Sequence, residues 1–209
     1  MSTPAMNPPL LSVQGLSLSF GGVKAIAGLN LEVRAGEVLA VIGPNGAGKT
    51  SMLNTVTRVF DPSAGQIVFK GQDLARVPRH RIAAHGIART FQNIELFEAA
   101  TVMDNLLLGR HRFHHGAWWQ QLLRTPAVTR LEEEARAAAE AVIEFLDLSP
   151  WRNAVIAGLP YGVRKVVELG RALCTKPELL FLDEPASGLN PEETRDLAFW
   201  IDDIRSDLG

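Results

Sequence analysis

Apolar and polar positions in the first third of the chain alternate in short runs, which is typical of β-strands. Clusters of turn-forming residues separate these runs, at Gly21-Gly22, Gly36 and 63–65. We therefore expect strands at four places: Leu11–Phe20, Leu29–Val33, Glu37–Ile42 and Gln66–Phe69.

From about Ala99 to Leu148 the apolar residues recur with a helical period. The clearest case is Leu131–Leu148, where glutamates and Arg136 occupy one face. The opposite face is apolar and consists of Ala135, Ala138, Ala139, Val142, Ile143 and Leu146. The pattern predicts a long amphipathic helix within a helical block.

The last third returns to an α/β pattern. A helix is expected after Tyr161, followed by the apolar strand Leu179–Leu182 and a second helix. Asn190 is a good N-cap for that second helix, with Pro191 at its first position and two glutamates in its first turn. The order of elements predicts an α/β core interrupted by an inserted helical subdomain.

Composition narrows the possible classes of protein. The 209 residues are 46% hydrophobic and 21% charged, which suits one globular domain with a packed core. A formal net charge of −2 gives no electrostatic support for a nucleic-acid partner. Cys174 is the only cysteine, so an internal disulfide is excluded, and its helical context favours packing over a nucleophilic role.

Residues 1–10 lack the features of a signal peptide and are expected to be a flexible lead-in. The longest apolar runs fall far short of the ~20 residues that cross a bilayer. If the protein acts at a membrane, we expect it to do so peripherally, on the cytoplasmic face of the inner membrane and through other subunits.

One segment matches the phosphate-binding pattern G-x-x-x-x-G-K-[ST]. Its residues are Gly43, Pro44, Asn45, Gly46, Ala47, Gly48, Lys49 and Thr50. It follows an apolar run and precedes a helical one, so its backbone N–H groups and a helix N-terminus would face a phosphate. Lys49 is expected to reach the β- and γ-phosphates, Thr50 to bind magnesium, and Ser51 to add a phosphate contact.

Two carboxylates end the predicted strand Leu179–Leu182. Asp183 is expected to orient magnesium, and Glu184 to polarise the attacking water as a general base. An acidic pair at an ordinary turn before Pro185 is the alternative for this dipeptide alone. The phosphate-binding motif earlier in the chain favours the functional interpretation.

With these motifs the chain resembles the ABC ATPase family over nearly its whole length. The resemblance implies a P-loop NTPase core of ABC ATPase type, with an N-terminal antiparallel β subdomain and an inserted helical subdomain. It places the β subdomain and P-loop core at 11–94, the helical subdomain at 95–165 and the rest of the core at 166–209. It also implies ATP and Mg²⁺ as ligands.

The resemblance assigns further residues. Phe20 stands where the family has an aromatic that stacks on adenine, although a core aromatic is the alternative. Gln92 matches the glutamine that touches magnesium and the attacking water. The loop that meets the partner ATPase would be Ser187, Gly188, Leu189 and Asn190.

The signature stretch departs from the family's L-S-G-G-Q, because the chain has Leu159, Pro160, Tyr161, Gly162 and Val163. The serine hydroxyl is missing, and Pro160 has no N–H that could replace it. We expect a weakened half-site for the partner's nucleotide.

The family's switch histidine is also missing, because all five histidines precede the signature: His80, His85, His111, His114 and His115. We expect that the chain stops short of the strand that carries this residue. The alternative is a chain that binds ATP better than it cleaves it.

Within the family, the chain is similar to the LivG-type subunit of branched-chain amino-acid importers. The similarity rests on FGGVKAI, RTFQNIELF, the L-P-Y-G variant, DEPASGLNPEE and an insert at Gly109–Arg130. It implies a second ATPase subunit, two permeases and a solute-binding protein as partners, with a permease contact near Gln92–Glu98. Trp118-Trp119 and His114-His115 in the insert would either pack the helical subdomain or touch the membrane subunit.

Three alternatives remain for the function: the ATPase of a urea or amide importer, an ABC ATPase not attached to a transporter, and an inactive ATP-binding module. The single motif set and the absence of sustained heptads argue against the second. Lys49 and Glu184 argue against the third.

Overall fold

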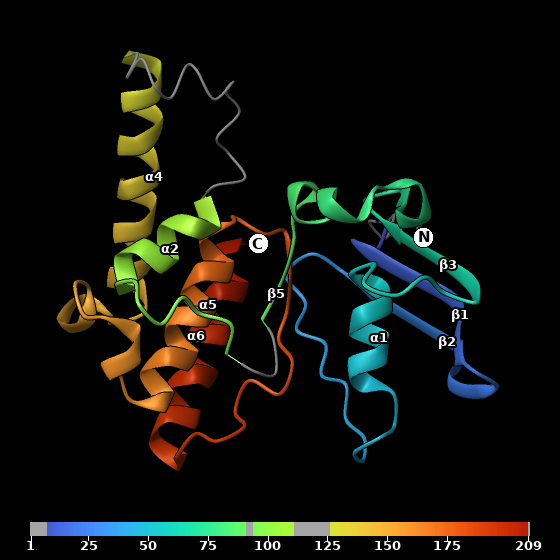
Figure 1. Cartoon of the computed structure of the whole chain (residues 1–209). Coiled ribbons are helices and arrows are strands. Elements are labelled where there is room, and N and C mark those ends of the chain that lie inside the picture. Colours follow the sequence, from blue (N-terminus) through green and yellow to red (C-terminus); the bar gives the residue numbers. More distant parts are fainter. Residues whose placement is uncertain (1–7, 91–93, 111–125, 209) are drawn as a thin grey trace, which may run out of the picture. The chain divides into compact units, whose positions relative to one another are not determined.

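A computed structural model describes residues 8–90, 94–110 and 126–208 of the protein (Figure 1). The chain divides into two compact units, Met1–His85 with Asp203–Gly209, and Gly86–Asp202. The first unit holds an antiparallel sheet, the phosphate-loop segment and one helix. The second holds packed helices and a pair of parallel strands. This architecture confirms the predicted fold class.

The sheet of the first unit has the strand order β2-β1-β3-β4 and is antiparallel throughout. Its strands are β1 (Leu11–Phe20), β2 (Val23–Val33), β3 (Ala64–Phe69) and β4 (Gln72–Asp73). Alternate apolar residues of β1 are buried, namely Leu11, Val13, Leu16 and Leu18. Three of the four strands expected in this region are confirmed, two of them within longer observed strands.

A close backbone approach holds β3 against β1. Gly65 has a φ of +95°, and a Cβ there would lie 2.6 Å from the carbonyl carbon of Gly15 and from the Cα of Leu16. The β1–β3 register shifts between Gln14 and Ser17, at the same place. Only glycine fits position 65, because both the conformation and the space exclude a side chain.

The expected strand Glu37–Ile42 is wrong, since no strand pairs with it within the described ranges. The Glu37 N–H instead donates to the Arg34 carbonyl at 3.2 Å, which is a turn contact. The side chain of Ile42 is 94% exposed. An apolar sequence of strand type becomes a strand only when a neighbouring strand completes its hydrogen bonds.

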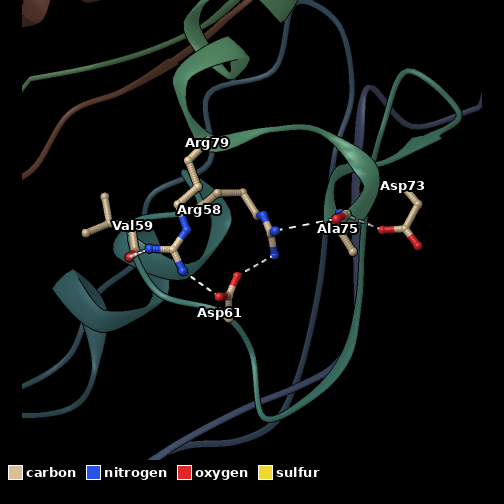
Figure 2. Close-up of polar contacts among 6 residues, drawn as sticks. All are labelled: Arg58, Val59, Asp61, Asp73, Ala75 and Arg79. Carbon is tan, nitrogen blue, oxygen red and sulfur yellow. Dashed lines mark hydrogen bonds and ion pairs between the residues drawn. The ribbon is translucent and has the colours of Figure 1, made fainter.

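Helix α1 (Lys49–Val56) is followed by a cluster of polar contacts that ties its end to a later segment (Figure 2). Asp61 binds two arginines: Arg58 Nη1 lies 2.9 Å from Asp61 Oδ1, and Arg79 Nη2 donates to Asp61 Oδ2. Arg79 also donates to the Val59 carbonyl at 3.3 Å. These contacts anchor the short helix η2 (Arg79–Arg81), and Arg58 Nη2 donates to the Ala75 carbonyl of η1 (Leu74–Arg76) at 3.4 Å. A third short helix, η3 (Ala83–His85), follows.

In the second unit α2 (Val102–Arg110), α4 (Pro126–Phe145) and α5 (Tyr161–Cys174) pack side by side (Figure 1). The long amphipathic helix is confirmed, although α4 ends three residues before the expected Leu148. Its buried residues on the expected face are Ala135, Ala139 and Ile143. Gly170 allows close packing, because a Cβ there would lie 2.9 Å from a methyl group of Leu106.

Two short helices, η5 (Ser149–Trp151) and η6 (Ile156–Gly158), connect α4 to α5. Arg152 in this connection donates to both carboxylate oxygens of Glu140. This hydrogen bond lowers the pKa of Glu140 below its usual value.

The unit's strands β5 (Ile87–Arg89) and β6 (Leu179–Phe181) are parallel, with Ile87 opposite Leu179. Helix α6 (Pro191–Leu208) begins as expected. The Asn190 Oδ1 accepts hydrogen bonds from the N–H groups of Glu192 and Glu193, both at 2.9 Å, and Asn190 N–H donates to Glu193 Oε2. Asn190 and Glu193 thus accept hydrogen bonds from each other's backbone N–H, which is the arrangement of a capping box.

Two further findings concern the described residues. None of their helices combines the length and apolar character needed to cross a membrane. Cys174 is buried at the end of α5, and this burial raises its pKa to about 12.

We predict that Leu106→Ala lowers the free energy of unfolding by about 2–5 kcal/mol, because Leu106 is fully buried and its removal leaves a cavity. Leu108→Ala, on the same helix but 43% exposed, should change it by less than about 0.5 kcal/mol. Urea unfolding followed by circular dichroism measures both. Equal losses would contradict the packing described for α2.

Candidate functional site

The phosphate-loop segment forms a turn directly before α1. The Ala47 N–H donates to the Pro44 carbonyl at 3.2 Å. The Lys49 amine donates to the carbonyls of Gly43 and Pro44, at 2.6 and 3.0 Å. The lysine thus lies over the loop that precedes it, where its charge faces the loop's own backbone.

Gly48 is required at the start of α1 for two reasons. Its φ is +89°, and a Cβ there would lie 2.5 Å from the Ala25 carbonyl oxygen on β2. Asn45, Gly46 and Ala47 are exposed. The loop backbone is therefore accessible to a ligand, and Gly48 at its end packs against β2.

Thr50 and Ser51 lie in the first turn of α1 and are half-buried. This turn carries backbone N–H groups that no preceding turn of the helix satisfies. Anions bind favourably at such a place, because the helix dipole is positive there.

Phe20, the last residue of β1, is 45% exposed and so is not a core aromatic. Its ring meets the ring of Phe60 edge to face, with 5.1 Å between centroids and an interplanar angle of 79°. An exposed ring that is supported from its edge has a surface on which a flat ligand can stack.

Asp183 lies two residues beyond β6 and is 4% exposed. Its Oδ2 lies 2.8 Å from Nη2 of Arg89, the last residue of β5, whose side chain is 7% exposed. Arg89 is the first residue of the segment RTFQNIELF, and no role was predicted for it. A charged residue at the end of an apolar run was the one available signal, and its partner is 94 residues away.

Glu184 has a φ of +47°, a conformation that few residues other than glycine adopt. Its carbonyl oxygen accepts a hydrogen bond from the Ser187 N–H at 3.0 Å, and the buried Lys165 amine lies 3.4 Å from the same oxygen. The strained backbone turns the chain sharply away from β6. Such conformations persist only when surrounding contacts hold them.

The signature stretch lies at the start of α5. Pro160 is the N-cap and makes no side-chain capping bond, so the helix start lacks the usual hydroxyl. Leu159 and Gly162 are buried, Val163 is half-buried, and Tyr161 is 45% exposed. Within the signature, Leu159 and Gly162 are thus packed into the protein, while the ring of Tyr161 is accessible.

The Tyr161 ring packs against the expected dimer loop of the same chain. A Cβ on Gly188, where φ is +79°, would lie 2.8 Å from a ring carbon of Tyr161. The Lys165 amine lies 5.9 Å from the centroid of that ring. Ser187 and Asn190 are exposed and Leu189 is half-buried. This contact between the signature and the loop was not predicted.

Other predicted residues lie outside the described part of the chain. They are Gln92, the Trp118-Trp119 pair and the His114-His115 pair. Their proposed roles stay predictions.

The comparisons with known proteins agree with these motifs. The family model described as "ABC transporter" matches residues 26–187. The branched-chain amino acid transport ATP-binding proteins BraF of Pseudomonas aeruginosa and LivG of Escherichia coli K12 are 42% and 41% identical, over 202 and 201 residues. The matches cover 97% and 96% of this chain, and 79% of each relative.

The chain belongs to the ABC transporter family.

A relative with another solute in its name, the phosphonates import ATP-binding protein PhnC of Alcaligenes faecalis, is 38% identical over 189 residues. That match covers 89% of this ABC chain and 66% of the relative. Among solved structures, the ADP conformation of an ATP-binding cassette has a TM-score of 0.82 at 30% identity. It covers 96% of this chain and 78% of the other. The fold is that of an ABC ATPase, and the chain is an ATP-binding member of the family.

The donor set of this ABC ATPase fits magnesium. The expected ligands Thr50, Gln92 and Asp183 all offer oxygen, which Mg²⁺ prefers. In the described ranges, no group of three or more His, Cys, Asp or Glu could hold a metal ion. One carboxylate is sufficient when the phosphates of the nucleotide supply further ligands.

We predict that Glu184→Gly is more stable than Glu184→Ala by about 1 kcal/mol, because only glycine adopts φ +47° without strain. Both variants lack the carboxylate, so their difference isolates the backbone. The same pair at the exposed Glu134 of α4 should give the opposite sign, with alanine more stable by about 1 kcal/mol. Urea unfolding measures all four, and the same sign at both positions would refute the strain at Glu184.

Proposed function

We propose that this ABC ATPase binds and hydrolyses ATP to energise the import of branched-chain amino acids. The similarity to BraF and LivG along nearly the whole chain carries the solute assignment. The ATPase itself touches no solute, so this assignment is separate from the chemistry of the site.

In the proposed mechanism Lys49 and the N–H groups of 43–51 bind the phosphates, and Phe20 stacks on the adenine. Glu184 polarises the attacking water as the general base, assisted by Gln92. Thr50, Gln92 and Asp183 hold Mg²⁺. When bound, the ion neutralises charge that develops on the phosphates.

The proposed assembly contains a second ATPase subunit, two permeases and, indirectly, a solute-binding protein, at the cytoplasmic face of the membrane. ATP closes the two ATPases around two nucleotides, and the loop Ser187–Asn190 with the signature 159–163 meets the partner. Hydrolysis and product release reopen them.

A rigidly held aromatic supports the proposed permease contact at 92–98. Phe97 is 61% exposed, yet its backbone N–H and carbonyl both bond to the side chain of Asn105, at 2.9 and 3.2 Å. Asn105 is fully buried and also donates to the Thr101 carbonyl at 2.9 Å. An exposed aromatic on a fixed backbone is a good anchor for a partner, because little entropy is lost on binding.

We predict that Glu184→Gln lowers the rate of ATP hydrolysis by about 10²–10⁴-fold while ATP affinity stays within about twofold, since the amide cannot accept a proton. Glu144→Gln, an exposed change on α4, should leave both unchanged. Phosphate release from the assembled transporter and equilibrium nucleotide binding are the measurements. Normal hydrolysis by Glu184→Gln would refute its role as the base.

Uptake of labelled leucine and labelled urea, in cells with and without the gene, tests the solute. Loss of leucine uptake alone supports the proposal, and loss of urea uptake alone supports the urea importer instead. If neither uptake changes, both solute assignments fail. ATP hydrolysis by the purified protein then tests the ATPase assignment separately.

We also predict that Phe97→Ala lowers leucine uptake by at least about tenfold, because it removes the exposed aromatic that the permease would cover, while the chain's nucleotide affinity is unchanged. Phe199→Ala is the matched control, because Phe199 is equally exposed, at 64%, but lies on α6. Co-purification of the ATPase with its permeases measures assembly directly. Equal effects of the two substitutions would contradict a specific contact at Phe97.

A further inference from the structure

The described part of the chain contains a buried ion pair of which the proposed mechanism uses only one member, Asp183; it gives no role to the other, Arg89. The side chains of Arg89 and Asp183 are 7% and 4% exposed, and Arg89 Nη2 lies 2.8 Å from Asp183 Oδ2. A guanidinium forms planar, directional hydrogen bonds with a carboxylate, so this contact restricts rotation of the Asp183 side chain.

Backbone pairing fixes Arg89 directly and holds the strand end that Asp183 follows by two residues. Arg89 is opposite Phe181 in the parallel β5–β6 register. The ladder continues one residue further, because the Thr90 N–H donates to the Phe181 carbonyl at 2.9 Å. Both side chains thus extend from the carboxyl ends of neighbouring parallel strands, where α/β proteins place their ligand sites.

Stability alone gives a weak reason for this pair. Removing two charges from water costs free energy that their attraction often fails to recover, and apolar residues of similar volume are frequently as stable. The aspartate is, however, the carboxylate that the proposed function assigns to magnesium, and the next residue is Glu184.

From this geometry we propose that Arg89 is a positioning residue for the magnesium site. It holds the Asp183 carboxylate in one orientation before the metal–nucleotide complex binds. The Asp183 side chain then loses little conformational entropy on binding. The inference rests on the proposed function. Groups in the outer shell of metal sites act in this way, and their removal typically lowers metal affinity by about 10–100-fold.

The test compares two buried arginines of the same unit. Arg110 is buried too, with 7% of the whole residue exposed, but its Nη1 donates to the backbone carbonyl of Cys174 at 3.2 Å. Arg89→Met and Arg110→Met each remove one buried guanidinium. Only the first removes the contact with a predicted metal ligand.

The probe is Mn²⁺, whose binding in the presence of ADP is followed by electron paramagnetic resonance. We expect Arg89→Met to weaken Mn²⁺ binding by about 10–100-fold. ADP binding in EDTA should change by less than about twofold for the same variant. Arg110→Met should leave both affinities unchanged, whatever it does to stability.

Arg89→Lys is the second variant, for the case that Arg89→Met does not fold. It keeps the charge but loses the planar fork, and we expect an intermediate loss of Mn²⁺ affinity of about 3–10-fold, since Lys binds only as a point charge. Unchanged Mn²⁺ affinity in a folded Arg89 variant would overturn the inference. Equal losses of Mn²⁺ and metal-free ADP binding would also overturn it, because they indicate a structural role.

Failure of the inference can be separated from failure of the proposed function. If the unmodified protein binds Mn²⁺ with ADP and Asp183→Asn does not, the metal site stands and only the role of Arg89 is in question. If the unmodified protein binds no Mn²⁺ with ADP, the proposed magnesium site itself fails, and the inference fails with it.

Discussion

The pairing of two three-residue strands organises the second unit. β5 and β6 are separated by most of that unit's sequence, which includes α2, α4 and α5. Closing so long a loop costs conformational entropy, although that cost grows only slowly with loop length. The packing of the helices that lie between the strands offsets this cost. Helix α5 also contacts β5, so the helical block supports the strand that pairs with β6.

The residues that follow β6 are held by contacts with β5 and α5. Asp183 is fixed by Arg89 across the pair, and the next residue enters a left-handed conformation. Lys165 of α5 reaches the carbonyl of Glu184, while Tyr161 of the same helix packs on Gly188. The start of α5 and the turn after β6 are thus packed against each other.

Local signals in the sequence were sufficient for part of this structure. The helix that follows the phosphate-binding motif, the cap at Asn190 and the strand Leu11–Phe20 were predicted because neighbouring residues determine them. The pair Arg89–Asp183 and the contact of Tyr161 with Gly188 were missed, since each joins residues far apart in sequence. The error at Glu37–Ile42 has the same origin: alternation describes a side-chain pattern, whereas a strand also needs a hydrogen-bonding neighbour. The role of Gln92 stays a prediction.

The burial of Cys174 has a practical consequence for the chemical labelling of this protein. Cys174 is the chain's only cysteine, and a buried thiol with a pKa of about 12 holds almost no thiolate at neutral pH. Electrophilic reagents that react with thiolates will therefore not modify Cys174 in the folded state. A cysteine introduced at an exposed site can then carry a spin or fluorescent label without prior removal of the native one. The signal then comes from the chosen site alone, with no contribution from Cys174.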